Sequence, residues 1–568
     1  MEPHNTTCQN CKKEFPIEAD DIAFYEQMQV PEPTFCPECR MVRRFSAINS
    51  WSLFYRNCDK CQKRTLSMYP PDKKLTVYCQ PCWWADDWDG TEYAMDYDPS
   101  RPFLEQLKEL SEKTPYMALE NEYLTLKNCD YSNAMSHCKN CTLAIWADFC
   151  ENVYNSSILN NVKDVADSLR IFSSSELIYE SIGIDKSYKT CYSQECDSCS
   201  DVWFSRNCYS CINCVGCVNL RGKSYYIFNE PYTKEEYMKK LAELKLDTRA
   251  SIKALKKEAE AFWMKFPYRV YTGNAMNLNV SGEYVYESKN SKKMYIAEGA
   301  ENCKRCQLIT VKPAKDCVDY SGWGNGAELI YESANVGNNV NKVKFSAYCF
   351  PDVLNVEYCL WCIAGKNNFG CVNLKRKSYS ILNKQYSKEE YESLVAKIKA
   401  KMTNDKEYGE FPIGVFGKFA YNQSNAQKFF PKTKKEALKE GYTWEDEVEQ
   451  QVEATIAGDK LSETIKEIDD TILKEIISCT TCNCKYKINA LELELLRKMG
   501  LPLPDRCLKC REKARFDRLQ PAKLYDRQCA NPDANGSGRG CQKPIETSYS
   551  PERPEIVYCE SCYQQEVM

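Results

Sequence analysis

Histidine is almost absent from this sequence: only His4 and His137 occur among 568 residues. A zinc site rich in histidine is therefore excluded, and a Ser-His-Asp catalytic arrangement would need one of two histidines that lie in no recognisable motif. No run of residues approaches the roughly 18 apolar residues of a membrane span. The first residues lack the basic and apolar segments of a signal peptide. We expect a soluble, cytoplasmic protein whose thiols stay reduced.

A large net charge is also lacking. The formal charge of −4 provides no global field that would attract nucleic acid. The charge is unevenly distributed, because residues 40–64 contain seven basic side chains and one acid, whereas residues 86–98 contain six acids and no base. Such runs are often only solvated surface, although the basic run is alternatively a surface for phosphate.

Cysteine, in contrast, is abundant, with 35 residues. The odd number argues against a complete set of disulfides, and a reducing compartment favours metal binding or burial. The two ends of the chain repeat each other. Five N-terminal cysteines recur 471 positions later without a gap, and three more recur 480 positions later, after the inserted segment Asn531–Arg539. Each end therefore carries one copy of the same module, in which the retained cysteines mark what the module needs.

Seven of the eight cysteine pairs in these modules have the spacing Cys-x-x-Cys. Two such pairs supply the four thiolates that hold Zn²⁺ tetrahedrally, and the alternation of knuckle, strand, turn and strand is typical of a zinc ribbon. We expect no catalytic residue in these sites and about four Zn²⁺ per chain, because four-cysteine sites are closed. Taken sequentially, the ligand sets are Cys8, Cys11, Cys36 and Cys39; Cys58, Cys61, Cys79 and Cys82; Cys479, Cys482, Cys507 and Cys510; and Cys529, Cys541, Cys559 and Cys562.

Three alternatives stay open for these cysteines. The first and third pairs could share a metal in a cross-braced arrangement, four thiolates could hold an iron–sulfur cluster, or the cysteines could be buried thiols. Cys484 is excluded as a ligand because it aligns with Lys13. Between the first and second knuckles of each module, Asp21–Gln29 and Ala490–Met499 are predicted to form short amphipathic helices.

The middle of the chain is a second duplication. Glu176–Ser181 recurs as Glu328–Ser333, and each copy ends in a predicted capping box, Thr233–Glu236 and Ser387–Glu390. Cysteine pairs in the first copy advance in steps of twelve residues, which is too short for a helical repeat and predicts a parallel β-solenoid. The fold class is therefore multidomain and mainly β, with a double-zinc-ribbon module at each end of a duplicated solenoid of about 12-residue period.

Comparison of the two central copies assigns most central cysteines to the core. Cys138 and Cys141 stand opposite Ser291 and Met294, and metal ligands do not exchange with such residues. The run Cys208, Cys211, Cys214 and Cys217 resembles half of a ferredoxin ligand string, so metal binding there is left open.

The expected division of the chain has seven parts, with two amphipathic connecting helices at 252–266 and 461–477. The parts are a zinc-ribbon module at 1–90, an acidic linker and helix at 91–124, solenoid copies at 125–232 and 277–386 joined by a helical connector at 233–276, a helical and aromatic linker at 387–478, and a second zinc-ribbon module at 479–568.

Four strings carry a resemblance to a family. They are FCPECRMVRR (35–44), YCQPCWW (78–84), GCVNLRGKSYYIFNEPYTKEEY (216–237) and GYTWED (441–446). They resemble uncharacterised cysteine-rich, zinc-ribbon proteins of small-genome bacteria of the candidate-phyla type, over nearly the whole chain. The resemblance implies zinc ribbons but no activity, and Ser291 and Met294 depart from it where cysteines look usual.

Three functions are compatible with the sequence. The first is a non-catalytic zinc protein that contacts RNA or DNA through basic side chains on its ribbons. The second is a scaffold for protein partners, and the third is a thiol-redox enzyme, supported only by the surplus of thiols. No membrane contact or small-molecule substrate is indicated. The candidate nucleic-acid contacts are Arg40, Arg43, Arg44 and Arg56 in the first module and Arg511, Arg515 and Arg527 in the second.

Overall fold

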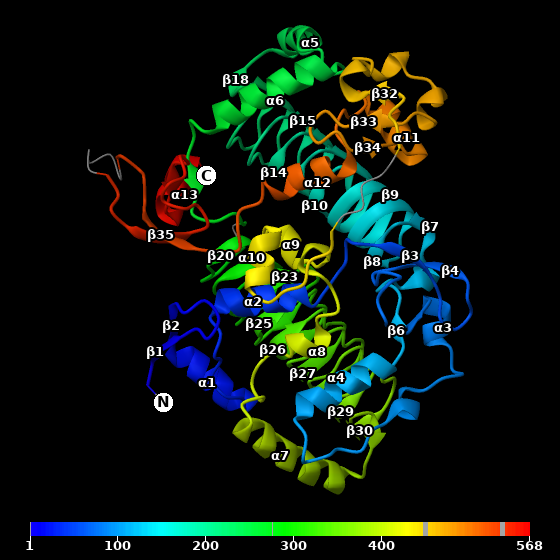
Figure 1. Ribbon diagram of the computed structural model, residues 1–568. Helices are drawn as coiled ribbons and strands as arrows, with labels where there is room; N and C mark the ends of the chain where they lie inside the picture. The colour runs from blue at the N-terminus through cyan, green and yellow to red at the C-terminus, as the bar shows by residue number, and fades with distance from the viewer. Residues whose placement is uncertain (1, 275, 447–451, 534–539, 568) are drawn as a thin grey trace. The chain divides into compact units, whose positions relative to one another are not determined.

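The computed structural model describes residues 2–274, 276–446, 452–533 and 540–567, and the chain divides into two compact units (Figure 1). Unit 1 contains residues 1–119, 271–445 and 521–524; unit 2 contains residues 120–270, 446–520 and 525–568. Unit 1 therefore joins the N-terminal module to the second solenoid, and unit 2 joins the C-terminal module to the first solenoid. Each terminal module packs on the solenoid that is more distant in the sequence.

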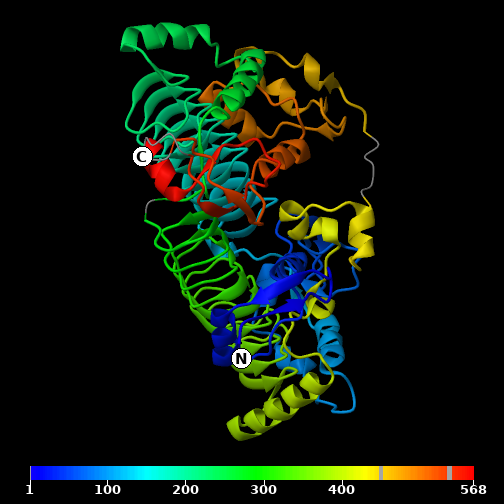
Figure 2. The same ribbon diagram turned by 90° about the vertical axis from the view of Figure 1, so that its left-hand side faces the viewer.

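Both central repeats are parallel β-solenoids, as predicted, and Figure 2 shows their stacked coils. Successive strands in unit 2 pair mostly at a spacing of twelve residues, for example Tyr188 with Ser200 and Ser200 with Ile212. The strands are β7 (Lys127–Asp130), β8 (Asn133–Ser136), β9 (Lys139–Ala166), β10 (Leu169–Phe172), β11 (Ser175–Tyr179), β12 (Ile182–Asp185), β13 (Tyr188–Cys191), β14 (Gln194–Asp197), β15 (Ser200–Trp203), β16 (Ile212–Val215) and β17 (Ser224–Ile227), closed by the antiparallel β18 (Glu230–Pro231).

The solenoid of unit 1 has the same plan, with steps of twelve to fourteen residues. Its strands are β20 (Gly282–Tyr286), β21 (Met294–Glu298), β22 (Ala300–Glu301), β23 (Gln307–Ile309), β24 (Ala314–Lys315), β25 (Val318–Ser321), β26 (Ala327–Ala334), β27 (Val340–Lys344), β28 (Leu354–Glu357), β29 (Lys366–Phe369), β30 (Ser378–Ile381) and the antiparallel β31 (Lys384–Gln385).

A three-residue pattern underlies the twelve-residue coil. From Asn128 to Arg170 every third residue has a positive φ, between 46° and 61°. Because a left-handed residue turns the chain, a coil of twelve residues has four corners. From Ser132 to Ile171 the residue after each corner, such as Cys138, Cys141 or Ala144, is buried. The Cys-x-x-Cys spacing of the middle region is therefore the length of one side of the coil and not a metal knuckle.

Side-chain hydrogen bonds stabilise the corners. A positive φ costs free energy in residues other than glycine, and asparagine is among those that tolerate it best. On one corner, Asn128 donates to Asn140, Asn140 to Asn152 and Asn152 to Asp164, at 2.9–3.1 Å. A second ladder is internal. Each hydroxyl of the series Ser156, Ser168, Ser181, Ser193 and Ser205 accepts from the backbone N–H one coil further on, and the last accepts from Cys217 at 3.0 Å.

The central cysteines occupy the inward positions, as the comparison of the copies predicted. Cys208, Cys211, Cys214 and Cys217 are each no more than 1% exposed. Their thiols donate to backbone carbonyls, as Cys217 does to Val215 at 3.5 Å, in the place where serine donates elsewhere in the same column. These thiols therefore act as small core residues.

This arrangement predicts that Cys217→Ser will be tolerated, with a change in the free energy of unfolding within about 1 kcal/mol, because serine continues the ladder. Ser205→Ala should cost about 1–3 kcal/mol, because it leaves the buried N–H of Cys217 without an acceptor. Chemical denaturation of both variants checks the order. A larger loss for Cys217→Ser than for Ser205→Ala would contradict the ladder.

Helices cap each solenoid. In unit 2, α5 (Lys234–Glu243) and α6 (Arg249–Trp263) follow the last coil, and in unit 1, α7 (Lys388–Asn404) does so. Both predicted capping boxes form, with Thr233 and Ser387 accepting from the N–H three residues later. The α6 side chains share a core with the solenoid aromatics, so the helix predicted at 252–266 packs on the coil as expected; these side chains are Ile252, Leu255 and Trp263, against Tyr192, Trp203 and Phe204.

The prediction of an amphipathic helix at 461–477 is wrong. The segment instead forms the 3-10 turns η4 (Gly458–Lys460), η5 (Ile465–Glu467) and η6 (Asp470–Leu473), followed by β33 (Ile477–Ser478). Thr464 and Asp469 each accept the backbone N–H two residues later. Such short-range acceptors compete with helix propagation. The isoleucines there follow a helical spacing without forming an α-helix.

The other elements of unit 1 lie along its solenoid. Phe103, which begins α4 (Phe103–Lys113), contacts Phe369 of the solenoid with ring centroids 5.1 Å apart. The acidic run also contacts the solenoid, because Asp89 pairs with Lys377 at 2.8 Å. The remaining elements are η1 (Gly90–Tyr93), β6 (Tyr116–Met117), α8 (Ile413–Phe416), η3 (Tyr421–Gln423), α9 (Ala426–Phe429) and α10 (Lys434–Lys439). No helix in the described ranges is both long enough and apolar enough to cross a membrane.

Candidate metal centres

The first cluster is built by a strand turn and a helix start. Cys8 and Cys11 lie between β1 (His4–Thr7) and β2 (Glu14–Ile17), and Cys36 and Cys39 open α2 (Pro37–Ser46). The turn after Cys11 requires the positive φ of 63° at Lys12. The copy repeats this plan, with Cys479 and Cys482 between β33 and β34 (Lys485–Tyr486), and Cys507 and Cys510 opening α12 (Leu508–Phe516). The predicted helices before these second knuckles form as α1 (Ala19–Met28) and α11 (Ala490–Met499).

The second cluster in each module lies at a two-stranded ribbon. Cys58 and Cys61 follow β3 (Phe54–Asn57), which pairs with β4 (Arg64–Ser67), and Cys79 and Cys82 follow β5 (Val77–Tyr78) at the start of α3 (Gln80–Trp84). In the copy, the strands are β35 (Tyr525–Gln528), β36 (Pro544–Thr547) and β37 (Val557–Tyr558), and the helix is α13 (Glu560–Val567). Cys529 and Cys541 flank the insertion, of which residues 534–539 lie outside the described residues.

In all four clusters the sulfur atoms lie within 4.8 Å of one another, in the four sets of the sequential assignment. Cross-bracing is therefore not what the chain forms. A tetrahedral ion with metal–sulfur bonds of about 2.3 Å requires sulfurs about 3.8 Å apart. The observed Sγ–Sγ separations agree: they are 3.7 Å for Cys11 and Cys36, 3.8 Å for Cys61 and Cys79, and 3.6 Å for Cys482 and Cys507.

Backbone N–H groups donate to one sulfur atom in each of three clusters. Cys58, Cys479 and Cys529 each accept the backbone N–H of the first cysteine in the facing knuckle, at 3.1–3.2 Å. Burial alone would raise the pKa of the Cys479 thiol, but N–H donors, with that of Cys507 the strongest, outweigh burial and lower this pKa to about 6. Each cluster can thus hold a divalent ion through four thiolates, with no position left for a substrate.

Among the described residues, no central cysteine belongs to a group that could hold a metal. The run Cys208–Cys217 is therefore accounted for by the solenoid core. Three carboxylates, those of Glu18, Asp20 and Asp21, also have oxygen atoms within 4.8 Å of one another. Lys304 already contacts Asp20 and Asp21 at 2.8 and 3.0 Å, so a cation of the protein itself compensates these carboxylates.

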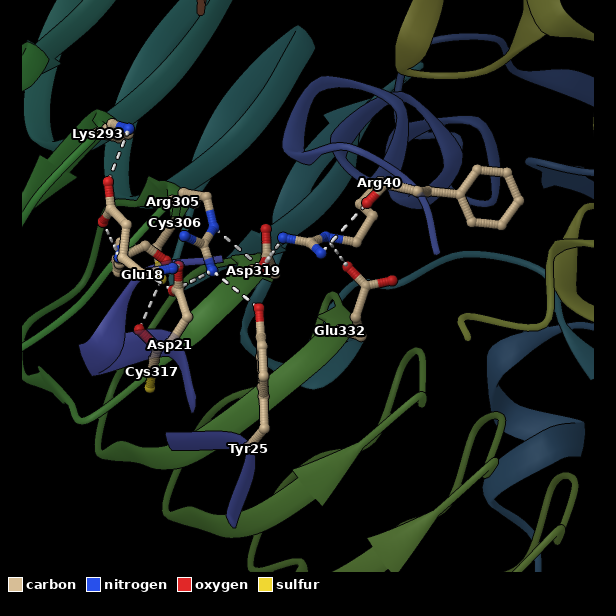
Figure 3. A network of polar contacts seen from close by, with 12 residues as sticks. Glu18, Asp21, Tyr25, Arg40, Lys293, Arg305, Cys306, Cys317, Asp319 and Glu332 are labelled. Carbon is tan, nitrogen blue, oxygen red and sulfur yellow. Dashed lines mark hydrogen bonds and ion pairs between the residues drawn. The ribbon is translucent and has the colours of Figure 1, made fainter. Parts of the chain in front are cut away.

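The arginines proposed as nucleic-acid contacts lie inside the protein. Arg40 and Arg44 occupy successive turns of α2 and are both fully buried. Figure 3 shows Arg40 beside Asp319 and Glu332. Arg40 donates to Asp319 at 2.7 Å, and Arg44 contacts Glu332 and donates to Ser321 at 3.1 Å. The basic face of the module is thus bound to the second solenoid. These two side chains are not available to phosphate, which corrects the expectation of an exposed basic surface.

The network continues onto α1. Arg305 of the solenoid pairs with Asp21 at 2.8 Å and with Asp319 at 3.2 Å, and Tyr25 lies beside it (Figure 3). Burial alone would raise the pKa of Asp21, but the Arg305 guanidinium outweighs it and lowers this pKa to about 2. Arg40, Arg44 and Arg305 are thus paired with Asp319, Glu332 and Asp21, and all six side chains are at most 6% exposed.

Unit 2 repeats this docking with the equivalent residues. Arg511 and Arg515 of α12 both donate to Asp167, the residue that stands 152 positions before Asp319. Arg511 also donates to Glu492, which is the counterpart of Asp21, at 2.6 Å. Arg511 and Arg515 are 5% and 4% exposed. The same two arginines of each module therefore bind the same corner of each solenoid.

The three remaining candidate contacts have partners within the protein, and Arg56 is buried whereas Arg43 and Arg527 are half-buried. Arg43 donates to the carbonyl of Phe411 at 2.7 Å, and Arg56 donates to Asp59 at 3.1 Å. Arg527 donates to the carbonyls of Ser550 and Glu555. The helices α2 and α12 were not predicted; Pro37 at the first turn of α2 is the local signal that would have indicated that helix.

The chain was compared with models of protein families, with curated proteins and with solved structures. No match is found in any of the three comparisons. The resemblance to small-genome bacterial proteins stays an expectation. The structure itself shows four clusters of four cysteines and two solenoids.

Proposed function

We propose that the protein is a non-catalytic scaffold of two solenoids, and that each terminal module is folded around two structural zinc ions, four in all. The four closed clusters of thiolates carry this proposal. Zn²⁺ suits them because four thiolates in a tetrahedron are one of its usual structural sites. Zn²⁺ is also redox-inert, and a scaffold needs no redox chemistry. The folding of each module is then coupled to metal, since a cluster of four thiolates repels itself without the ion.

A protein partner is favoured over nucleic acid because the arginines that both modules retain are paired with solenoid carboxylates. The outer surface of the first solenoid exposes large apolar side chains, among them Phe149, Tyr188 and Ile212, at 57%, 46% and 46%. Aromatic side chains are enriched at protein interfaces, where they supply area at low entropic cost. The rigid coil supports such a surface without chemistry of its own.

Metal analysis of the purified protein tests the zinc part of the proposal. Four zinc ions and no iron are expected per chain, and replacement by Co²⁺ should give the thiolate charge-transfer absorption of tetrahedral sites. A stoichiometry near two, or iron with visible absorption in the native protein, would contradict it.

Affinity capture tests the scaffold part. A protein partner that is recovered repeatedly and survives nuclease treatment supports it. Salt-sensitive binding of mixed RNA by the bare protein, with no nuclease-resistant partner, would instead favour the nucleic-acid function.

A further inference from the structure

Unit 2 contains a basic recess that the docking of the module does not explain. It leaves about 20 Å³ for the centres of water-sized molecules, and it lies where α12 and α6 meet the first solenoid. Five cations line it, namely Lys256, Arg506, Arg511, Arg515 and Arg518, against the two carboxylates Asp167 and Glu180. Exposure rises from 5% for the Arg511 side chain to 32% for that of Arg506, so Arg506 stands nearest the solvent.

With Glu492 and Glu260, which lie outside the lining, four carboxylates contact the five cations, so one positive charge is left uncompensated. Asp167 serves both Arg511 and Arg515, and Glu180 serves both Lys256 and Arg506, the latter at 3.6 Å. The nearest carboxylate to Arg518 is that of Glu260, 3.8 Å away on a half-exposed side chain, and the side-chain amide of Gln194 accepts from its Nε and Nη2 at 2.6 and 2.7 Å. Burial consequently lowers the pKa of Arg518.

Two hydrogen-bond donors of Arg511 have no partner. Its Nη1 atom binds Asp167 and Glu492, but Nε and Nη2 are buried without an acceptor. A buried guanidinium normally satisfies its donors, and leaving them unpaired costs free energy. An oxyanion in the recess would supply both the missing acceptors and the missing negative charge.

The N-terminal module acts as an internal control. It keeps the docking arginines as Arg40 and Arg44, but Phe35 and Ala47 stand where Arg506 and Arg518 stand in the copy. Ala47 is 1% exposed, so an apolar residue occupies that position in unit 1. Docking therefore requires neither Arg506 nor Arg518, and these two arginines are specific to the recess.

We propose that the recess of unit 2 binds a phosphate-class oxyanion. Arg506 and Lys256 meet the anion at the mouth, Arg518 lines the wall, and Arg511 donates to it from the interior. Three guanidinium groups around one site suit the tetrahedral array of oxygens on a phosphate, since each presents planar paired donors. This proposal does not depend on the identity of the metal or of a scaffold partner.

Calorimetric titration of the full-length, metal-loaded protein with inorganic phosphate, in Hepes at low ionic strength, tests the proposal. Saturable binding is expected for the wild type. Arg506→Phe and Arg518→Ala, which install the residues of the N-terminal copy, should each weaken it by about tenfold or more. Lys513→Ala removes a charge from the same helix at a side chain that is 74% exposed and should change the affinity less than about twofold. Unchanged metal content shows that the variants are folded.

The source of the phosphate is distinguished by a second titration. If a 5′-phosphorylated oligonucleotide binds more tightly than the same oligonucleotide with a 5′-hydroxyl, the ligand is the end of a polynucleotide. If the two oligonucleotides bind equally and inorganic phosphate binds saturably, the ligand is a free anion. No saturable phosphate binding by the wild type overturns the proposal. Binding that both arginine variants leave intact overturns it as well, because the anion would then lie elsewhere.

Discussion

Cys36→Ser is expected to reduce the metal content from four ions to three per chain and to unfold the first cluster of the N-terminal module. Serine is a poor zinc ligand, and Cys36 both contributes a thiolate and opens α2. The binding free energy of a structural zinc, about 10–16 kcal/mol in isolated fingers, is also folding free energy. Metal analysis by mass spectrometry, with limited proteolysis of residues 1–57, measures both effects.

Cys141→Ser is the matched control for this substitution. Cys141 also stands in a Cys-x-x-Cys pair and is fully buried, but its thiol donates to the carbonyl of Lys139 within the solenoid. All four ions and the protease resistance should be retained. Retention of four ions by Cys36→Ser, or loss of an ion by Cys141→Ser, would refute the division of the cysteines into ligands and core.

Arg44→Ala is expected to destabilise unit 1 by about 3–5 kcal/mol and to release the N-terminal module from its solenoid. The substitution leaves Glu332 buried without its closest cation and removes the donor to Ser321. Arg44→Lys should restore little of the loss, because an ammonium group cannot contact Glu332, Ser321 and Gln307 from one plane. Denaturant unfolding followed by tryptophan fluorescence measures the change.

Arg101→Ala provides the comparison on the surface of the same unit. Arg101 pairs with Glu105 and Glu109 from a side chain that is 38% exposed. Exposed pairs of this kind contribute about 0–1 kcal/mol. A cost for Arg44→Ala no larger than that of Arg101→Ala would mean that the buried network does not hold the module.

The metal clusters could be assigned from the sequence because their determinants are local. A knuckle of two cysteines and a turn, such as Cys8 to Lys12, needs only a few residues, and the second copy showed which cysteines are indispensable. The same comparison assigned Cys138 and Cys141 to the core, and their burial agrees. The three-residue side of the coil is also present in the sequence, as small or apolar residues at every third position from Cys129 to Ile171.

The role of the arginines could not be assigned in this way. Arg44 of the first module recurs as Arg515 of the second, which shows that each module needs an arginine at this position but not what the arginine contacts. Their partners, Glu332 and Asp167, are 288 and 348 residues away. An exposed basic surface and a buried ion-pair network have the same local sequence, because the difference lies in what packs against the helix.

The sequence by itself determined the two duplications, the four sets of thiolates and the solenoid, since each depends on spacing between near neighbours. Only the tertiary structure decided that each module binds the solenoid farther from it along the chain, and that the shared arginines are internal. It also placed Arg506 and Arg518, which only one copy carries, around a recess with unpartnered donors. These outcomes depend on contacts between segments hundreds of residues apart, where the pairing of charges is decided by burial and geometry.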